Sequence, residues 1–246
     1  MLRLLDARTG SYTPVRPTRP GVLRVYAHVP AMDSPEDLTG LRILLVADLI
    51  TRAAELRRLQ VLTAATAGNG TGDLVGRLGI HPPVAWAAPE EAEAALGGPI
   101  DVRLTSSNTA TTGAVVGAAR GELAADPIAL RFALLSVPWS EPADITADAQ
   151  AAAGHTVKDW RRQVAEWARS PSGPIPPPLA ERIRTAFDDL DTGAALALLR
   201  DLAADEAVPP GTRFETFVYV DRLLGLELPR DIGQGDIGQG DIGQGP

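Results

Sequence analysis

Cysteine, histidine and lysine, which serve as nucleophiles, acid–base groups or metal ligands in many proteins, are absent or few in this chain of 246 residues. It contains no cysteine and three histidines, which are His28, His81 and His155, and Lys158 is its single lysine. Without cysteine the chain cannot form a disulfide, a thiolate zinc site, an iron–sulfur cluster or a cysteine nucleophile. A closed zinc site needs four ligands, and the histidines lie in separate segments, so zinc is not expected.

Two polar stretches resemble ligand sites but have simpler explanations. The stretch AGNGTG, at residues 67–72, lacks the lysine of a phosphate-binding P-loop and the GxGxxG spacing, so we expect an ordinary loop after a strand. Asp33, Glu36 and Asp37 precede a long helix, where carboxylates cap the backbone and favour the helix dipole. Binding of magnesium or an amine is the alternative explanation for these acids.

The charge balance excludes some partners. The chain has 23 basic and 31 acidic side chains, a net charge of −8 and a pI near 4.9. It therefore lacks the basic surface on which nucleic-acid binding usually depends, and we do not expect it to bind tRNA alone.

The longest apolar run, Ile43–Ile50, is broken by Asp48 and is too short to span a membrane. We expect a cytoplasmic protein with no membrane partner.

The first half of the chain has the pattern of a parallel α/β unit. Residues 22–29, VLRVYAHV, predict a buried strand, and a helix then runs to about Arg58, capped by Asp37 or Thr39. The next strand covers residues 60–66. A strand–helix–strand unit of this kind predicts a parallel sheet with a ligand crevice at the carboxyl ends of its strands.

Shorter elements surround this unit. Strands at residues 2–6 and 12–15 flank a turn at Thr9-Gly10 and predict a hairpin. A short acidic helix is expected at residues 89–96 and a strand at residues 100–104.

The second half of the chain reads as helices. Five helical patterns cover residues 129–137, 143–170, 178–189, 194–205 and 213–224. Trp139, Trp160 and Trp167 are expected in the core of a helical bundle, and Asp189 or Asp191 is expected to cap the helix that begins near Gly193. We therefore predict a core at residues 1–125, a bundle at 126–230, and a disordered tail at 231–246 that repeats DIGQG.

The chain opens with MLRLLDARTG, VRPTRPGVLRVYAHVP and LRILLVADLITRAAELRRLQVLT, and its second half contains DPIALRFALLS, WRRQVAEWA and FDDLDTGAALALLRDLA. The first block resembles the opening of cysteinyl-tRNA synthetases. The second resembles the helical part of those enzymes and of their relative, the mycothiol-pathway ligase that joins cysteine to an inositol–glucosamine. The resemblance implies a Rossmann-like class I synthetase core with a reduced parallel sheet, which activates cysteine with ATP, followed by an α-helical bundle.

The motifs that carry the chemistry of that family are changed here. His28 stands where the family has a zinc-binding cysteine, and Ser106 and Ala110 replace two further zinc ligands. The family's HIGH-type signature corresponds to Asp37-Leu38-Thr39-Gly40, and an aspartate there repels phosphate. No lysine takes the place of the KMSKS loop. The nucleotide-binding residues that the resemblance implies are Pro30, Asp37, Thr39, Gly40, Arg42, Asp101 and Arg103.

Three hypotheses for function follow from this pattern. The first is a truncated, degenerate relative of cysteinyl-tRNA synthetase, with a remnant crevice for ATP and magnesium or another adenine-containing ligand and with little or no adenylate-forming activity. The second is an active ATP-dependent ligase for a different amino acid or acyl group, in which Arg42 or Arg103 replaces the missing cations. The third is an interaction module whose helical half docks a protein partner.

Overall fold

The computed structural model describes residues 1–6, 10–31, 34–66, 75–106, 113–123 and 125–234. Its central sheet has five parallel strands in the order β5-β4-β3-β6-β7. The strands are β3 (Val22–Ala27), β4 (Gln60–Ala65), β5 (Ala85–Trp86), β6 (Val102–Thr105) and β7 (Ala114–Val115). The predicted α/β class with a parallel sheet is confirmed.

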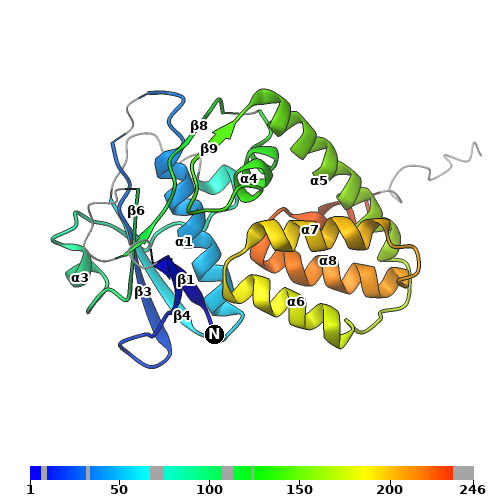
Figure 1. Ribbon diagram of the computed structural model, residues 1–246, viewed down its shortest axis with the longest axis horizontal. Coiled ribbons are helices and arrows are strands. Elements are labelled where there is room, and N and C mark those ends of the chain that lie inside the picture. The colour runs from blue at the N-terminus through cyan, green and yellow to red at the C-terminus, as the bar shows by residue number, and fades with distance from the viewer. Residues whose placement is uncertain (7–9, 32–33, 67–74, 107–112, 124, 235–246) are drawn as a thin grey trace, which may run out of the picture.

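Helix α1 (Thr39–Glu55) connects β3 to β4 and lies against one face of the sheet, while the short helix α3 (Ala92–Ala95) lies on the other side (Figure 1). Every residue from Thr39 to Thr51 is buried, because the sheet and the later helices enclose α1. Burial on all sides explains the nearly continuous apolar sequence of α1. It also means that the two charged residues in this stretch, Arg42 and Asp48, need partners inside the protein.

The order of the strands defines the position of the crevice. Strand β3 has β4 on one side and β6 on the other, with Val25 paired to Thr63 and to Val102. The chain therefore leaves β3 in one direction and returns on its other side with β6. In open parallel sheets, ligands bind outside the carboxyl ends of the strands at such a switch point.

The first residues form the predicted hairpin. Strands β1 (Arg3–Asp6) and β2 (Ser11–Pro14) are antiparallel, and Gly10 at their turn has a φ of 62°. Arg3 pairs with Asp189 at 2.7 Å, and the amino group of Met1 lies 2.8 Å from Asp188. The hairpin is thereby attached to the end of α6.

The helices of the second half are α4 (Pro127–Leu135), α5 (Ala147–Trp167), α6 (Pro177–Asp188), α7 (Thr192–Ala204) and α8 (Pro210–Leu224), followed by the 3₁₀ helix η1 (Leu228–Asp231). Asp191 caps α7 by accepting a hydrogen bond from the Ala194 amide at 2.8 Å, as predicted. Figure 1 shows α6, α7 and α8 packed side by side.

The prediction of a helix at residues 143–170 is wrong for its first residues. Ala143–Ile145 is strand β9, which pairs in parallel with β8 (Ala119–Gly121). The helix begins only after Thr146, whose hydroxyl caps it by accepting from the Ala149 amide at 3.1 Å. The partner strand is more than twenty positions earlier in the chain, so local helical periodicity does not reveal this pairing.

A single hydrophobic cluster runs from β3 through α1 to the helices. Trp160 contacts Phe132 and Phe217, both with ring centroids 5.6 Å apart, and Trp167 contacts Phe217 at 5.1 Å. Trp139 is also buried, so the prediction that all three tryptophans are core residues is confirmed. The division at residues 125 and 126 into two domains stays a prediction.

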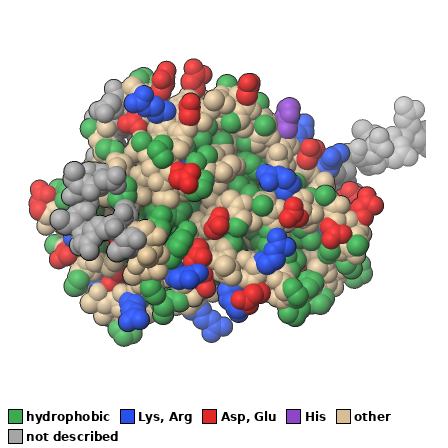
Figure 2. All heavy atoms as spheres, in the orientation of Figure 1, with side chains coloured by type: hydrophobic (Ala, Val, Ile, Leu, Met, Phe, Trp, Pro, Cys, Tyr) green, Lys and Arg blue, Asp and Glu red, His purple; other side chains and the backbone are tan. Residues whose placement is uncertain are grey.

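The first residues of the predicted disordered tail, 231–234, have defined structure. Asp231 ends η1, and the Gln234 amide donates to the Asp231 carbonyl at 3.3 Å. The rest of the tail, 235–246, lies outside the described residues. Among the helices that the structure describes, none combines the length and apolar character needed to cross a membrane. Figure 2 shows acidic and basic side chains interspersed over one face of the molecule.

Candidate functional site

The candidate crevice lies where β3 and β6 end, beside the start of α1. His28 follows β3 directly, and its amide donates to the Leu104 carbonyl at 2.9 Å, which continues the pairing of the two strands. Pro30, two residues further on, is half-buried. Ser106 follows β6 and is also half-buried. These segments form the edge of the sheet at which the topology predicts a ligand.

A chain of polar groups crosses the ends of β3, β4 and β5. The hydroxyl of Thr66 lies 3.2 Å from Nδ1 of His28 and 2.9 Å from the hydroxyl of Tyr26, which donates to the Ala87 carbonyl at 3.1 Å. Each hydroxyl has one hydrogen, so Thr66 must donate to Tyr26, and His28 must donate to Thr66. A neutral His28 therefore carries its proton on Nδ1, which leaves Nε2 as an acceptor.

The amino end of α1 is held by groups of the protein itself. The carboxylate of Asp37 accepts a hydrogen bond from the Thr39 amide at 2.9 Å. The Leu38 amide donates to the Ala119 carbonyl at 2.9 Å, and the Thr39 hydroxyl accepts from the Ala119 amide at 3.1 Å. A negative charge at a helix amino end is favourable for the helix, but it occupies the place that a phosphate would take.

Gly40 permits close packing of α1 on the loop after β3. A Cβ atom at this position would lie 2.7 Å from Cγ1 of Val29, closer than real contacts of this kind. The glycine of the signature thus has a packing role in this structure. Pro30, Asp37, Thr39 and Gly40 are brought to one region, as expected for a crevice at the start of α1.

Arg42 lies one turn inside α1 and is 1% exposed. Its terminal nitrogens donate to backbone carbonyls that include those of Gly117 at 3.1 Å, Val137 at 3.2 Å and Pro138 at 2.7 Å. Further acceptors are the carbonyls of Ala118 and Glu141. Burial lowers the pKa of Arg42 to about 10. Arg42 therefore anchors two loops to α1, and its hydrogen bonds are directed into the protein.

Asp101 lies at the opposite edge of the sheet, immediately before β6. Its carboxylate accepts from the Thr18 amide and hydroxyl, both at 2.6 Å, and from the Arg24 amide at 2.8 Å. It therefore fixes the connection that leads into β3. The structure does not bring Asp101 together with the residues at the start of α1.

Arg103 lies within β6 and extends over the face of the sheet that α3 covers. Its guanidinium carbon is 5.9 Å from the centre of the Tyr26 ring, and NH2 is 3.5 Å from Glu93. Both contacts are on the α3 side, whereas α1 lies on the other face. Of the seven residues implied by the resemblance, Asp101 and Arg103 thus lie apart from the other five.

A cluster of buried charge surrounds Asp48, in the middle of α1. Its carboxylate accepts from Arg131 at 2.6 Å, from Arg52 at 2.8 Å, and from the ring and amide of His81 at 2.6 and 3.0 Å. Burial alone would raise the pKa of Asp48, but the His81 hydrogen bond and the two arginines hold that pKa well below its usual range.

Arg131 extends the cluster to other elements. It is fully buried, and it donates to the carbonyls of Leu224 at 2.6 Å and Leu78 at 3.0 Å as well as to Asp48. The cluster thus joins α1, α4, the end of α8 and the segment before β5. The sequence shows one signal for this cluster, which is Asp48 interrupting the apolar run of α1. Arg131 lies 83 positions away, so local sequence does not reveal that the two residues pair.

The described residues contain no group of three or more His, Cys, Asp or Glu side chains that could hold a metal ion. His28, His81 and His155 are on separate elements. The expectation that zinc is not bound stays a prediction. Asp33, the glycine-rich stretch at 67–72 and Ala110 lie outside the described residues.

No family model matches the sequence. Over 108 residues the chain is 38% identical to L-cysteine:1D-myo-inositol 2-amino-2-deoxy-alpha-D-glucopyranoside ligase from Thermobispora bispora. The match covers 42% of this chain, and the chain spans about a quarter (25%) of the length of that ligase. This similarity shows a distant relation to a cysteine ligase. The truncated and degenerate character predicted from the motifs stays a prediction.

Proposed function

We propose that the chain is a ligase-related protein that does not form an aminoacyl adenylate and that acts by binding. The relation to a cysteine ligase and the parallel α/β core support a crevice for an adenine-containing ligand. Adenylate formation needs positive charge or donors to stabilise the phosphates of ATP as they react. The proposal depends on what occupies the place where those phosphates would lie.

The observation that carries the proposal is the hydrogen bond from the Thr39 amide to the Asp37 carboxylate at 2.9 Å. A helix amino end attracts phosphate because its amides are free and its dipole is positive. In this chain a carboxylate takes one of these amides and adds a negative charge. Phosphate binding at α1 would require displacing Asp37 or approaching it against charge repulsion.

The rival hypothesis of an active ligase is less well supported. It needs Arg42 or Arg103 to replace the missing cations at the phosphates. Arg42 donates to backbone carbonyls inside the protein, and Arg103 lies on the α3 face of the sheet. The guanidinium of Arg42 is thus held by five backbone carbonyls, and that of Arg103 lies on the face of the sheet opposite to α1. The interaction-module hypothesis also stays open, and no contact among the described residues favours it.

A comparison of ATP with adenosine tests the proposal. We expect ATP with magnesium to raise the melting temperature no more than adenosine does. The reason is that the phosphates of ATP make no favourable contact at the amino end of α1. Replacing Asp37 with Asn should strengthen ATP binding several-fold while leaving adenosine binding unchanged. The matched control is Glu36→Gln, which removes the same charge from the neighbouring exposed residue.

Two results would contradict the proposal. The first is tighter binding of ATP than of adenosine by tenfold or more to the unaltered chain, since that difference corresponds to about 1.4 kcal/mol of phosphate recognition. The second is an equal gain in ATP affinity from Glu36→Gln, because the effect would then come from net charge and not from the carboxylate at α1.

A further inference from the structure

Two accessible side chains with functional chemistry lie on the α3 face of the sheet, near the carboxyl ends of its strands. His28 follows β3, and Arg103 lies in the neighbouring strand β6. Tyr26, the partner of Arg103 in the register of these strands, packs toward α3. His28 comes two positions after Tyr26, so its side chain lies on the same face of the sheet.

A continuous set of contacts connects His28 with Arg103. The hydroxyl of Thr66 lies 3.2 Å from Nδ1 of His28 and 2.9 Å from the hydroxyl of Tyr26. The guanidinium carbon of Arg103 is 5.9 Å from the centre of the Tyr26 ring. The two accessible side chains therefore belong to one cluster, with Tyr26 buried beneath them.

His28 offers an acceptor of fixed direction. The hydrogen-bond chain ends at the Ala87 carbonyl, so Nδ1 of the neutral ring donates to Thr66 and Nε2 keeps its lone pair. His28 is exposed, and no hydrogen bond to Nε2 occurs among the described residues. Because Nε2 is on the far side of the ring from Thr66, it can accept a hydrogen bond from a ligand.

Arg103 offers a flat cation on the same face as that acceptor. Its side chain is 38% exposed, and NH2 lies 3.5 Å from the carboxylate of Glu93. Glu93 and the Tyr26 ring thus flank the guanidinium, whose planar group can stack on an aromatic ring. A stacking surface together with an acceptor suits a flat heterocycle that carries a donor group at its edge.

We propose that His28 and Arg103 recognise the base of the adenine-containing ligand. The 6-amino group of adenine donates to Nε2 of His28, and the purine ring stacks on the guanidinium of Arg103. This inference rests on the proposed function and adds the residues that select the base. It places the base on the face of the sheet opposite to α1, away from the Asp37 carboxylate.

Three nucleosides of nearly equal shape test this assignment on the full chain. Purine riboside lacks the 6-amino group of adenosine, and inosine has an oxygen acceptor in its place. Affinities are measured by titration calorimetry at about pH 8, above the ordinary pKa of histidine. We expect adenosine to bind about three- to tenfold more tightly than purine riboside, as one neutral hydrogen bond allows. Inosine should bind most weakly, because its oxygen faces the lone pair of Nε2.

Variants separate the roles of the two residues. His28→Phe should remove the preference for adenosine over purine riboside, whereas His155→Phe, at an exposed histidine of α5, should leave it unchanged. Thr66→Val should move the proton to Nε2 and reverse the order of adenosine and inosine. Arg103→Lys should weaken the binding of adenosine and purine riboside alike, since both lose the stacking surface.

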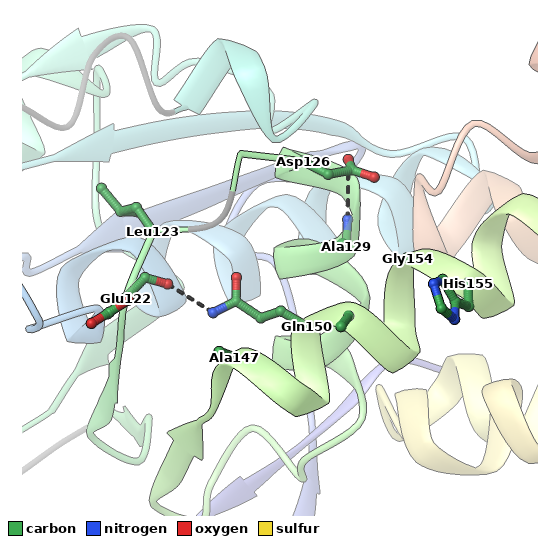
Figure 3. Close-up of a pocket in the computed structure, with 9 residues that line it drawn as sticks. Glu122, Leu123, Asp126, Ala129, Ala147, Gln150, Gly154 and His155 are labelled. Carbon is green, nitrogen blue, oxygen red and sulfur yellow. Dashed lines mark hydrogen bonds between the residues drawn. The ribbon is translucent and has the colours of Figure 1, made fainter.

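The pocket between the amino ends of α4 and α5 is the alternative location for the nucleoside (Figure 3). Its volume is about 320 Å³, and its lining includes Leu123, Ala129 and the exposed Ala151. Ala151→Trp fills this pocket and should leave adenosine binding unchanged.

The outcomes distinguish this inference from the proposed function. Equal affinities for adenosine and purine riboside, or an unchanged order of nucleosides in Thr66→Val, would overturn the assignment to His28 and leave the proposed function intact. Loss of adenosine binding in Ala151→Trp, or no binding of adenosine to the unaltered chain, would overturn both.

Discussion

Asp48 is buried in α1 and accepts hydrogen bonds from two arginines and a histidine. Its carboxylate compensates the buried charge of Arg131, which has no exposure to solvent. We expect Asp48→Asn to lower the free energy of unfolding by about 3–5 kcal/mol, because it leaves that guanidinium buried without an opposite charge. Urea unfolding at neutral pH measures the loss, and Asp159→Asn on the surface of α5 is the control. A loss below about 1 kcal/mol would contradict this role.

Asp48 also makes the free energy of unfolding depend on pH. The pKa of Asp48 is held well below its usual range, so the unfolded chain binds more protons than the folded one under acidic conditions. Its contribution to stability is complete above the unfolded pKa of about 3.9 and is lost as the pH falls toward the folded pKa. We expect the urea midpoint to fall between about pH 5 and pH 3 in the unaltered chain. Asp48→Asn should show a smaller fall over this range.

His28 has a testable proton position. The chain of hydrogen bonds through Thr66 and Tyr26 to the Ala87 carbonyl places the proton of the neutral ring on Nδ1. Thr66→Val removes the group that accepts this proton and should shift the ring toward the Nε2–H form. The ¹⁵N shifts of the imidazole at alkaline pH distinguish the two forms. An Nε2–H ring in the unaltered chain would show that the hydrogen-bond chain does not form as described.

At the scale of elements, two helical glycines give opposite predictions. Gly40→Ala should destabilise the fold by about 1–3 kcal/mol, because its Cβ would lie 2.7 Å from a methyl of the stiff Val29 side chain. Gly154→Ala should stabilise it by about 0.5–1 kcal/mol, since its nearest contact, the Ala129 Cβ at 3.5 Å, is ordinary. Thermal unfolding of both variants checks the pair. A Gly40→Ala variant as stable as the unaltered chain would mean that α1 does not pack on the β3 loop as closely as described.

The elements differ in how well the sequence predicts them. The strand β3 and helix α1 were predicted because a strand buried on both faces and a long apolar helix have distinct patterns. Strands β5, β7, β8 and β9 have two or three residues each and exist through pairing with distant segments. A window of local sequence contains no sign of that pairing, so the local pattern predicts the start of a helix where the structure has β9.

At the scale of the whole molecule, the sheet and the helices share one core. The hydrophobic cluster is continuous, and the Asp48–Arg131 pair connects α1 with α4 and α8. We therefore expect the region of residues 1–125 and that of residues 126–230 to unfold together. Hydrogen exchange in low urea should show β3, α1, α5 and α8 losing protection with the same denaturant dependence. Earlier loss of α5 and α8 would instead support two independent domains.

The candidate site could be predicted only in part, for a physical reason. Sequence order places Pro30, Asp37, Thr39 and Gly40 at one end of the βαβ unit, and they do lie there. The same reasoning does not show where a long side chain extends. Arg42 is directed to the carbonyls of residues 117, 118, 137, 138 and 141, and Gln150 reaches the Glu122 carbonyl. Such contacts depend on tertiary packing, which local patterns do not contain.

ATP–pyrophosphate exchange tests the central claim most directly, because it detects adenylate formation without requiring the acceptor substrate. The assay would use the full chain with magnesium, cysteine and each of the other amino acids, with an active cysteine ligase as the positive control. The account predicts no exchange above background with any amino acid. Saturable exchange with even one of them, abolished by Asp37→Ala and retained in Glu36→Gln, would show that the amino end of α1 supports catalysis and would contradict the account.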